Sequence, residues 1–308
     1  DTMPYSNPAS CDQQCAEDIA AFIQTLWPTA LSCDASTTPV VYGARQLKIL
    51  TQREYQNTVE DLLNVDYEVA DGLSADSQVG FFTNNTHTSV LSSTYNNYLL
   101  VAEELAQWSA DQGFSNVMSC SALDESCAAT LVNDVAPKIF RRPLTADEHS
   151  TYESIALGTF NGGDIAEGIK LALEGLLSSP QFIYRHELGE PNPANLELDS
   201  DGFELTSYEM ATFLAYTFTG STPDDELLAA AANDELRDEA MIMAQAARLA
   251  SGAESVLADF IGSWLGTAEL EVAAKDESLY PNYQALVPHM KAELNQTFAW
   301  IMMQRDEQ

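Results

Sequence analysis

The stretch LTQREYQNTVEDLL, residues 50–63, decides the kind of fold that this chain adopts. Its apolar residues Tyr55, Val59 and Leu63 recur at the spacing of one helical face. Thr51 and Glu54 fit a capping box, in which each side chain accepts a hydrogen bond from the backbone N–H of the other residue. The stretch therefore predicts an amphipathic helix that begins just after Thr51.

The same pairing of threonine with an acidic residue three positions later occurs three more times along the chain. The pairs are Thr145 with Glu148, Thr206 with Glu209, and Thr222 with Asp225, the last with Pro223 expected at the first helical position. Helical periodicity predicts helices at 13–27, 51–64, 92–111, 127–141, 146–158, 163–178, 206–219, 224–232, 236–251, 254–266 and 286–303. We therefore expect a mainly α protein with bundle-like helical domains, irregular loops and little or no sheet.

Two segments with the composition of linkers divide the chain into three expected parts. Segments rich in proline, aspartate and asparagine at 32–41 and 189–202 interrupt the helical pattern. We expect a small N-terminal piece at 1–33, helical domain structure over 42–188, and a C-terminal helical domain over 203–308. The longest expected irregular segment is 67–88, and long loops often carry function.

The charge of the chain excludes several classes of partner. Forty-seven acidic and 13 basic residues give a formal net charge of −34, which repels phosphate backbones and anionic lipid and argues against nucleic-acid binding. A solvated acidic surface, cation binding and a basic protein partner are all compatible with this charge. No apolar run is long enough to predict a transmembrane segment. Among the scarce basic residues, Arg141 and Arg142 are expected to form internal pairs with carboxylates.

Five cysteines lie in two local groups, which is typical of short-loop disulfides in an oxidising compartment. We predict that Cys120 pairs with Cys127, and that two of Cys11, Cys15 and Cys33 pair with each other. A zinc site is the alternative, but the nearest histidine in sequence is His87, and zinc usually takes four Cys or His ligands.

Several phrases, taken together and in order, resemble the planctomycete-type cytochrome-c-associated domains of unknown function. They are EYQNTVEDLL, GFFTNN, RRPLT, LTSYEMA, TPDDELL and DFIGSWLG, which lie between residues 54 and 266. The resemblance implies an exported bacterial protein with a helical fold and an association with electron transfer. It also implies further domains beyond the last helix, so we expect the family's chain to continue past Gln308.

The first residues resemble the end of a c-type cytochrome domain, so 1–33 is interpreted as its C-terminal remnant. Met3 precedes an amphipathic segment, Ala16 to Trp27, and a methionine thioether is a normal axial ligand of haem iron. Met3 is therefore the candidate axial ligand. The CxxCH motif that attaches haem c is absent, so the haem would belong to an upstream segment; the alternative is a chance likeness of one helix after a methionine.

Two further candidate sites involve metal ions. Asp199, Asp201 and Glu204 form an oxygen-rich turn that suits calcium, although an ordinary Asp-Gly turn explains the same residues. His87 lies in the 67–88 loop without a second His or Cys at ligand spacing, so a structural hydrogen bond is the alternative to metal ligation.

No nucleophile, metalloprotease or phosphate-loop motif is recognisable, so whether the chain is an enzyme stays open. The leading hypothesis is an accessory or scaffold part of an exported, cytochrome-c-linked electron-transfer protein, acting in the periplasm, at the outer surface or outside the cell, with a basic redox protein as partner. One alternative is an extracellular enzyme that acts on polysaccharide or another polymer near loop 67–88. Another is a calcium-stabilised structural or adhesive surface protein.

Overall fold

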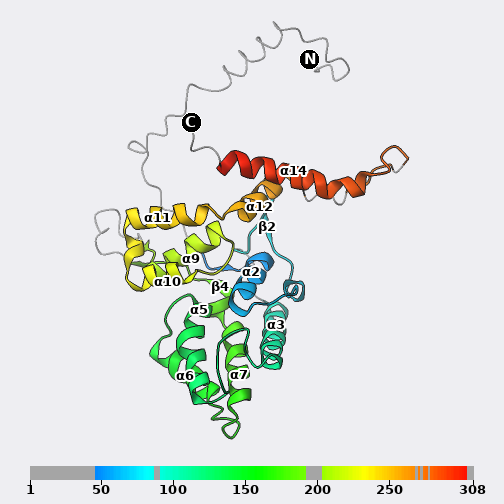
Figure 1. Ribbon diagram of the computed structural model, residues 1–308. Helices are drawn as coiled ribbons and strands as arrows, with labels where there is room; N and C mark the ends of the chain where they lie inside the picture. Colours follow the sequence, from blue (N-terminus) through cyan, green and yellow to red (C-terminus); the bar gives the residue numbers. More distant parts are fainter. Residues whose placement is uncertain are drawn as a thin grey trace, which may run out of the picture. The chain divides into compact units, whose positions relative to one another are not determined.

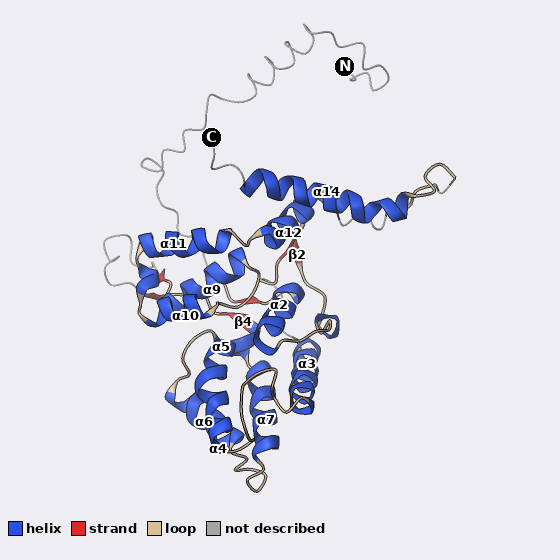
Figure 2. Ribbon diagram, in the orientation of Figure 1, coloured by secondary structure: helices blue, strands red, loops and turns tan. Residues whose placement is uncertain are grey.

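Helices make up most of the structure, a computed structural model, as the sequence predicts (Figures 1 and 2). The structure describes residues 46–86, 91–191, 203–267, 270, 273–276 and 278–303, and all of them belong to one unit, Ala44–Gln308. The predicted helix at 13–27 lies outside the described residues. The strands of the described part form only two-residue antiparallel pairs, so the expectation of little or no sheet is confirmed.

Helices and two-residue strands follow one another along the described part of the chain. The α-helices are α2 (Gln52–Leu63), α3 (Ser92–Asp111), α4 (Glu125–Thr130), α5 (Ala136–Phe140), α6 (Ala146–Ala156), α7 (Ile165–Leu177), α8 (Pro180–Ile183), α9 (Ser207–Phe218), α10 (Asp225–Ala232), α11 (Glu239–Ala250), α12 (Glu254–Leu265) and α14 (Tyr283–Met303). The strands are β1 (Lys48–Ile49) paired with β4 (Tyr184–Arg185), β2 (Gln78–Val79) paired with β3 (Phe82–Thr83), and β5 (Glu190–Pro191) paired with β6 (Phe203–Glu204).

Three of the four predicted capping boxes are confirmed. Thr51, Thr145 and Thr206 each accept a hydrogen bond from the acidic residue three positions later, which in turn accepts from the threonine N–H. Each box satisfies N–H groups that the helix itself leaves without a partner. These local contacts fix the starts of α2, α6 and α9.

The fourth predicted capping box, Thr222 with Asp225, is wrong. Helix α10 starts at Asp225, and its N-cap is Asp224, whose carboxylate accepts from the N–H of Leu227. Asp224 is as good a cap as threonine and lies closer to the helix, so it takes the position. The buried hydroxyl of Thr222 makes no hydrogen bond to a described residue.

The helix expected over 127–141 is interrupted. Helix α4 passes into a π-helical turn at Leu131–Val135, and α5 then continues the chain from Ala136. The turn buries Leu131, Val132 and Val135 in the core. Cys127, in α4, forms the predicted disulfide with Cys120, and their Cα atoms are 5.6 Å apart.

Apolar side chains collect into two clusters. The first surrounds Tyr55 and Phe182, both fully buried, and gathers the inner faces of α2, α3, the α4–α5 segment and α7. The second is formed by α9, α10 and α11 and includes the buried Leu214 and Leu227. Tyr216, on α9, is the exception: it faces the first cluster rather than the second. Helix α9 therefore has one face in each cluster.

Candidate functional site

Arg141 is buried at the end of α5, with 3% of its surface exposed. Its backbone adopts the left-handed conformation, φ 57°, which ends the helix and is uncommon for a residue other than glycine. The guanidinium Nη2 donates to the carbonyl oxygens of Gln181, Phe182 and Tyr184 at 2.8–3.0 Å. The predicted carboxylate pair of Arg141 is therefore wrong: carbonyls at the turn from α8 to β4 take its hydrogen bonds.

Arg185, on β4, is a second buried guanidinium, and it does pair with carboxylates. Its Nη1 lies 2.9 Å from Oε1 of Glu54, and its Nε donates to Glu187 at 2.6 Å. Lys48 also reaches Glu54, with Nζ 3.1 Å from Oε1. Burial alone would raise the pKa of the Glu54 carboxyl, but Lys48 and Arg185 hold this pKa below its ordinary value.

Tyr216 joins both arginines to α2. Its hydroxyl lies 2.8 Å from Oγ1 of Thr58 and accepts from Nη1 of Arg141 at 3.3 Å. The guanidinium of Arg185 lies 4.8 Å from the centroid of the Tyr216 ring, within cation–π range. We call Glu54, Thr58, Arg141, Arg185 and Tyr216 the arginine junction. It links α2, the α5–β4 region and α9 through buried polar contacts.

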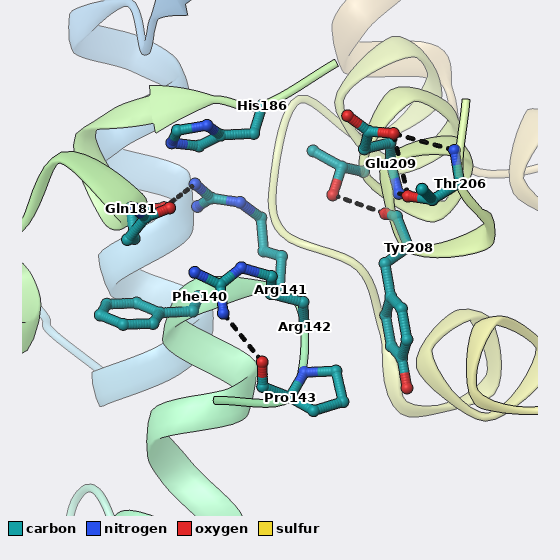
Figure 3. Close-up of a pocket in the computed structure, with 10 residues that line it drawn as sticks. Phe140, Arg141, Arg142, Pro143, Gln181, His186, Thr206, Tyr208 and Glu209 are labelled. Atoms are coloured by element: carbon teal, nitrogen blue, oxygen red, sulfur yellow. Dashed lines mark hydrogen bonds between the residues drawn. The ribbon is translucent and has the colours of Figure 1, made fainter. Parts of the chain in front are cut away.

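A cavity of about 380 Å³ lies beside the arginine junction (Figure 3). It is lined by Phe140, Arg141, Arg142, Pro143, Gln181, His186, Thr206, Tyr208, Glu209 and Thr212. Figure 3 shows the two arginines, Gln181 and His186 on one side, and Thr206, Tyr208 and Glu209 of the α9 start on the other. Both the volume and the mixture of apolar walls with a few polar groups are typical of small-molecule sites.

The charged groups of this cavity differ in their hydrogen-bond and ion-pair partners. Arg142 forms a bidentate pair with Glu148, with both N–O distances 2.8 Å, as predicted. These bonds to Arg142 lower the pKa of the Glu148 carboxyl to about 2. Glu209 accepts hydrogen bonds from the N–H groups of Leu188, Gly189 and Thr206 and from the Thr206 hydroxyl. Its negative charge is thus covered by donors.

His186 follows β4 and is half-buried in the lining of the cavity. Its Nε2 lies 3.3 Å from the carbonyl oxygen of Pro180, so Nε2 carries the proton and donates, and the neutral ring leaves Nδ1 as an acceptor. Burial is the main reason why the pKa of His186 lies below its ordinary value, and the nearby Arg141 and Arg142 lower it further. The ring is therefore neutral at pH 7.

A second, more polar cleft of about 900 Å³ lies where the 67–88 loop meets α12 and α14. The loop is not wholly irregular, because it contains the β2–β3 hairpin. Asp76 anchors it: the carboxylate accepts from the N–H of Gln52 at 3.1 Å and from the amide of Asn85 at 2.7 Å. Burial keeps the pKa of Asp76 above its ordinary value even so. The ring of Phe82 stacks on Phe260, with centroids 5.4 Å apart.

Most of the sequence-predicted site residues lie outside the described residues. These are Met3, Cys11, Cys15, Cys33, His87, Asp199 and Asp201. Glu204, the remaining calcium candidate, is described, and its carboxylate lies 3.9 Å from Nη1 of Arg237. Within the described ranges, no group of three or more His, Cys, Asp or Glu residues is arranged to hold a metal ion. The haem, calcium and His87 assignments stay predictions.

Taken together, the fold and the site define a helical protein whose segments are joined by a buried polar junction. Three family models match consecutive parts of the chain: PSD3, a protein of unknown function (DUF1587), over residues 48–111; PSD5, a protein of unknown function (DUF1595), over 127–187; and PSD4, a protein of unknown function (DUF1592), over 205–308. The chain therefore carries three planctomycete cytochrome-c-associated domains of unknown function.

The arginine junction takes residues from all three matched segments: Glu54 and Thr58 from the first, Arg141 and Arg185 from the second, and Tyr216 from the third. No curated protein and no solved structure matches the chain. In the part of the chain that the structure describes, no helix is both long enough and apolar enough to cross a membrane.

Proposed function

We propose that this chain is an accessory part of an exported, cytochrome-c-linked protein, and that its helical unit docks a basic redox protein in electron transfer. One observation carries the proposal. All three cytochrome-c-associated segments contribute residues to the arginine junction, and the chain that they form has a net charge of −34. The junction holds these segments in a fixed arrangement. The charge guides a basic partner to the surface and speeds its association.

The surface formed by α3 and α7 is the strongest candidate for the docking contact. The two helices pack together, and they bring Glu103 and Glu174 close to each other. Burial raises the pKa of the Glu174 carboxyl, and repulsion from Glu103 raises it further, while Lys170 opposes this. A lysine of a basic partner would relieve this repulsion, because opposite charges at short range favour the ionised carboxylate.

Binding of a basic c-type cytochrome to the natively purified chain tests the proposal. We expect the dissociation constant, measured together with the association rate by surface plasmon resonance, to rise steeply as salt is added, because surface charges are screened over about 10 Å at 0.1 M ionic strength. The double variant Glu103→Gln, Glu174→Gln should slow association at low salt by about threefold or more.

The matched control is Glu239→Gln with Glu254→Gln, which removes the same charge from exposed positions on α11 and α12. It should leave association close to that of the unchanged chain. Equal slowing in the two double variants would reject the α3–α7 surface as the contact. Absence of binding at any salt concentration would reject docking itself.

A second candidate function, action on a polysaccharide or another polymer, is favoured by the cleft beside the 67–88 loop. The stacked Phe82 and Phe260 rings and the carboxylate of Asp76 line this cleft. Aromatic faces and carboxylates are common contacts for sugar rings. The ring centroids of Trp264 and Phe260 are 6.3 Å apart, so oligosaccharide binding in this cleft should change tryptophan fluorescence. An unchanged spectrum over a range of oligosaccharides would argue against this candidate.

A further inference from the structure

Arg141 has no carboxylate partner among the described residues. Its hydrogen bonds go to three carbonyl oxygens and to the hydroxyl of Tyr216, all of them neutral acceptors. Arg185, equally buried, is compensated by Glu54 and Glu187. Buried charges in proteins are normally paired, because an uncompensated charge away from water is costly. Arg141 is therefore a buried cation that lacks a counterion in the described part of the chain.

The side chain of Arg141 borders the cavity of about 380 Å³, and Arg142, His186 and Tyr208 belong to the same lining. No hydrogen bond to a described residue uses the Nε–H of Arg141 or of Arg142, Nδ1 of His186, or the hydroxyl of Tyr208. The arginine N–H groups are donors, whereas the neutral ring of His186 is an acceptor at Nδ1. The cavity thus offers donors for an anion and, separately, an acceptor for a hydroxyl.

The remaining walls are compatible with an anionic ligand. Glu209 is the carboxylate of the lining, and its four hydrogen bonds from Leu188, Gly189 and Thr206 cover its charge. Phe140 and Pro143 add apolar surface on which the carbon skeleton of a ligand can pack. An oxoanion at Arg141 would therefore meet no bare negative group in the described lining.

From these contacts we propose that the cavity binds a small hydroxy-carboxylate, of up to about the size of a single sugar acid, with its carboxylate at the arginines and a hydroxyl at Nδ1 of His186. The carboxylate supplies the counterion that Arg141 lacks. Each of the two unused Nε–H groups can donate one charge-assisted hydrogen bond to a carboxylate oxygen. The cavity lies between the second and third family segments, so the ligand stabilises their contact by binding only the folded state.

Calorimetric titration of the full chain with four probes separates the parts of this proposal. D-glucuronate carries both a carboxylate and hydroxyls, D-glucose only hydroxyls, acetate only a carboxylate, and inorganic sulfate is an oxoanion without a carbon skeleton. Glucuronate should bind at least tenfold more tightly than each of the other three, and it should raise the melting temperature. If sulfate or acetate bound as tightly as glucuronate, the proposal would be overturned in favour of a simple anion site. If glucose bound as tightly as glucuronate, the carboxylate would not contribute to binding, and the proposed contact with the arginines would be overturned.

Two variants place the binding in this cavity. Arg142→Gln and His186→Leu should each weaken glucuronate binding at least fivefold. Arg248→Gln is a matched control, because Arg248 also forms a bidentate pair, with Asp224, and its side chain is 32% exposed against 30% for Arg142. Equal weakening in Arg248→Gln, or unchanged affinity in both cavity variants, would overturn the assignment. None of these positions belongs to the α3–α7 surface, so this test fails or succeeds independently of partner docking.

Discussion

The guanidinium of Arg185 lies 4.8 Å from the ring centroid of Tyr216, and this contact joins residues from two different family segments. The hydroxyl of the same tyrosine meets Thr58 from a third segment at 2.8 Å. Because the ring is buried, none of these contacts can be replaced by water without opening the core. The stability of the whole unit should therefore respond to changes at Tyr216.

Removing only the hydroxyl of Tyr216 should lower the free energy of unfolding by about 1 kcal/mol, because Thr58 and Arg141 each lose a hydrogen bond. Tyr216→Leu also removes the ring beside Arg185 and should cost about 3 kcal/mol. Urea denaturation measures both. Tyr280→Phe, at a tyrosine that is 57% exposed, is the control and should leave the unfolding midpoint unchanged. A Tyr216→Phe protein as stable as the unchanged chain would show that the hydroxyl contacts contribute nothing.

Two glycines of α7 should respond in opposite directions to alanine. A Cβ at Gly168 would lie 2.5 Å from the carbonyl oxygen of Ala156, so Gly168→Ala should push α6 from α7 and cost about 2 kcal/mol or more. At Gly175 the nearest atom, on Tyr152, is 3.5 Å away, so Gly175→Ala should gain up to about 1 kcal/mol from the better helix propensity. Thermal melts of the two variants give the signs, and a stabilising Gly168→Ala would contradict the close packing of these helices.

Thr222→Val should leave stability unchanged or raise it by up to about 1 kcal/mol, because it removes a buried hydroxyl that has no described hydrogen-bond partner. The same substitution at Thr206 should cost about 1 kcal/mol, since that hydroxyl caps α9. Chemical denaturation of the pair distinguishes the two roles. A loss of stability in Thr222→Val as large as that in Thr206→Val would restore the capping role that the sequence suggested for Thr222.

The pair of Arg142 with Glu148 should make stability fall in acid. The pKa of Glu148 is lowered to about 2 in the folded protein, so between this value and its ordinary pKa the unfolded state binds more protons. The contribution is therefore complete above about pH 5 and disappears as the pH falls towards 2. Arg142→Gln should flatten this part of the curve of unfolding free energy against pH. Identical curves for the two proteins would show that the pair has no effect on acid stability.

Local sequence patterns were enough to predict most helix starts. The boxes at Thr51, Thr145 and Thr206 depend on residues three positions apart, so no knowledge of tertiary structure is needed. At Thr222 the same pattern misled, because a second competent cap, Asp224, lies two residues further on. The π-helical turn at Leu131–Val135 also escaped prediction, since helical periodicity hardly changes over so short an insertion.

The candidate site could be predicted only in part, because its contacts join residues far apart in the chain. The sequence marked Arg141 and Arg142 as residues with internal partners, and it paired Arg142 correctly with a carboxylate. It could not show that backbone carbonyls at the α8–β4 turn would take the place of a carboxylate at Arg141. The sequence also could not predict that His186 lines the same cavity as the start of α9, because that placement depends on how the second and third family segments pack.

The arginine junction also limits how the genes of such proteins can recombine during evolution. A gene fragment that encoded only residues 127–187 would produce a polypeptide with Arg185 cut off from Glu54 and from the ring of Tyr216. Arg185 would keep only Glu187 as a carboxylate partner, and Arg141 would keep only its three carbonyl acceptors, so we expect this fragment to fold less stably than the whole unit. Separation of the chain at the family borders would divide the partners of the arginine junction, so we expect the three segments to be inherited together.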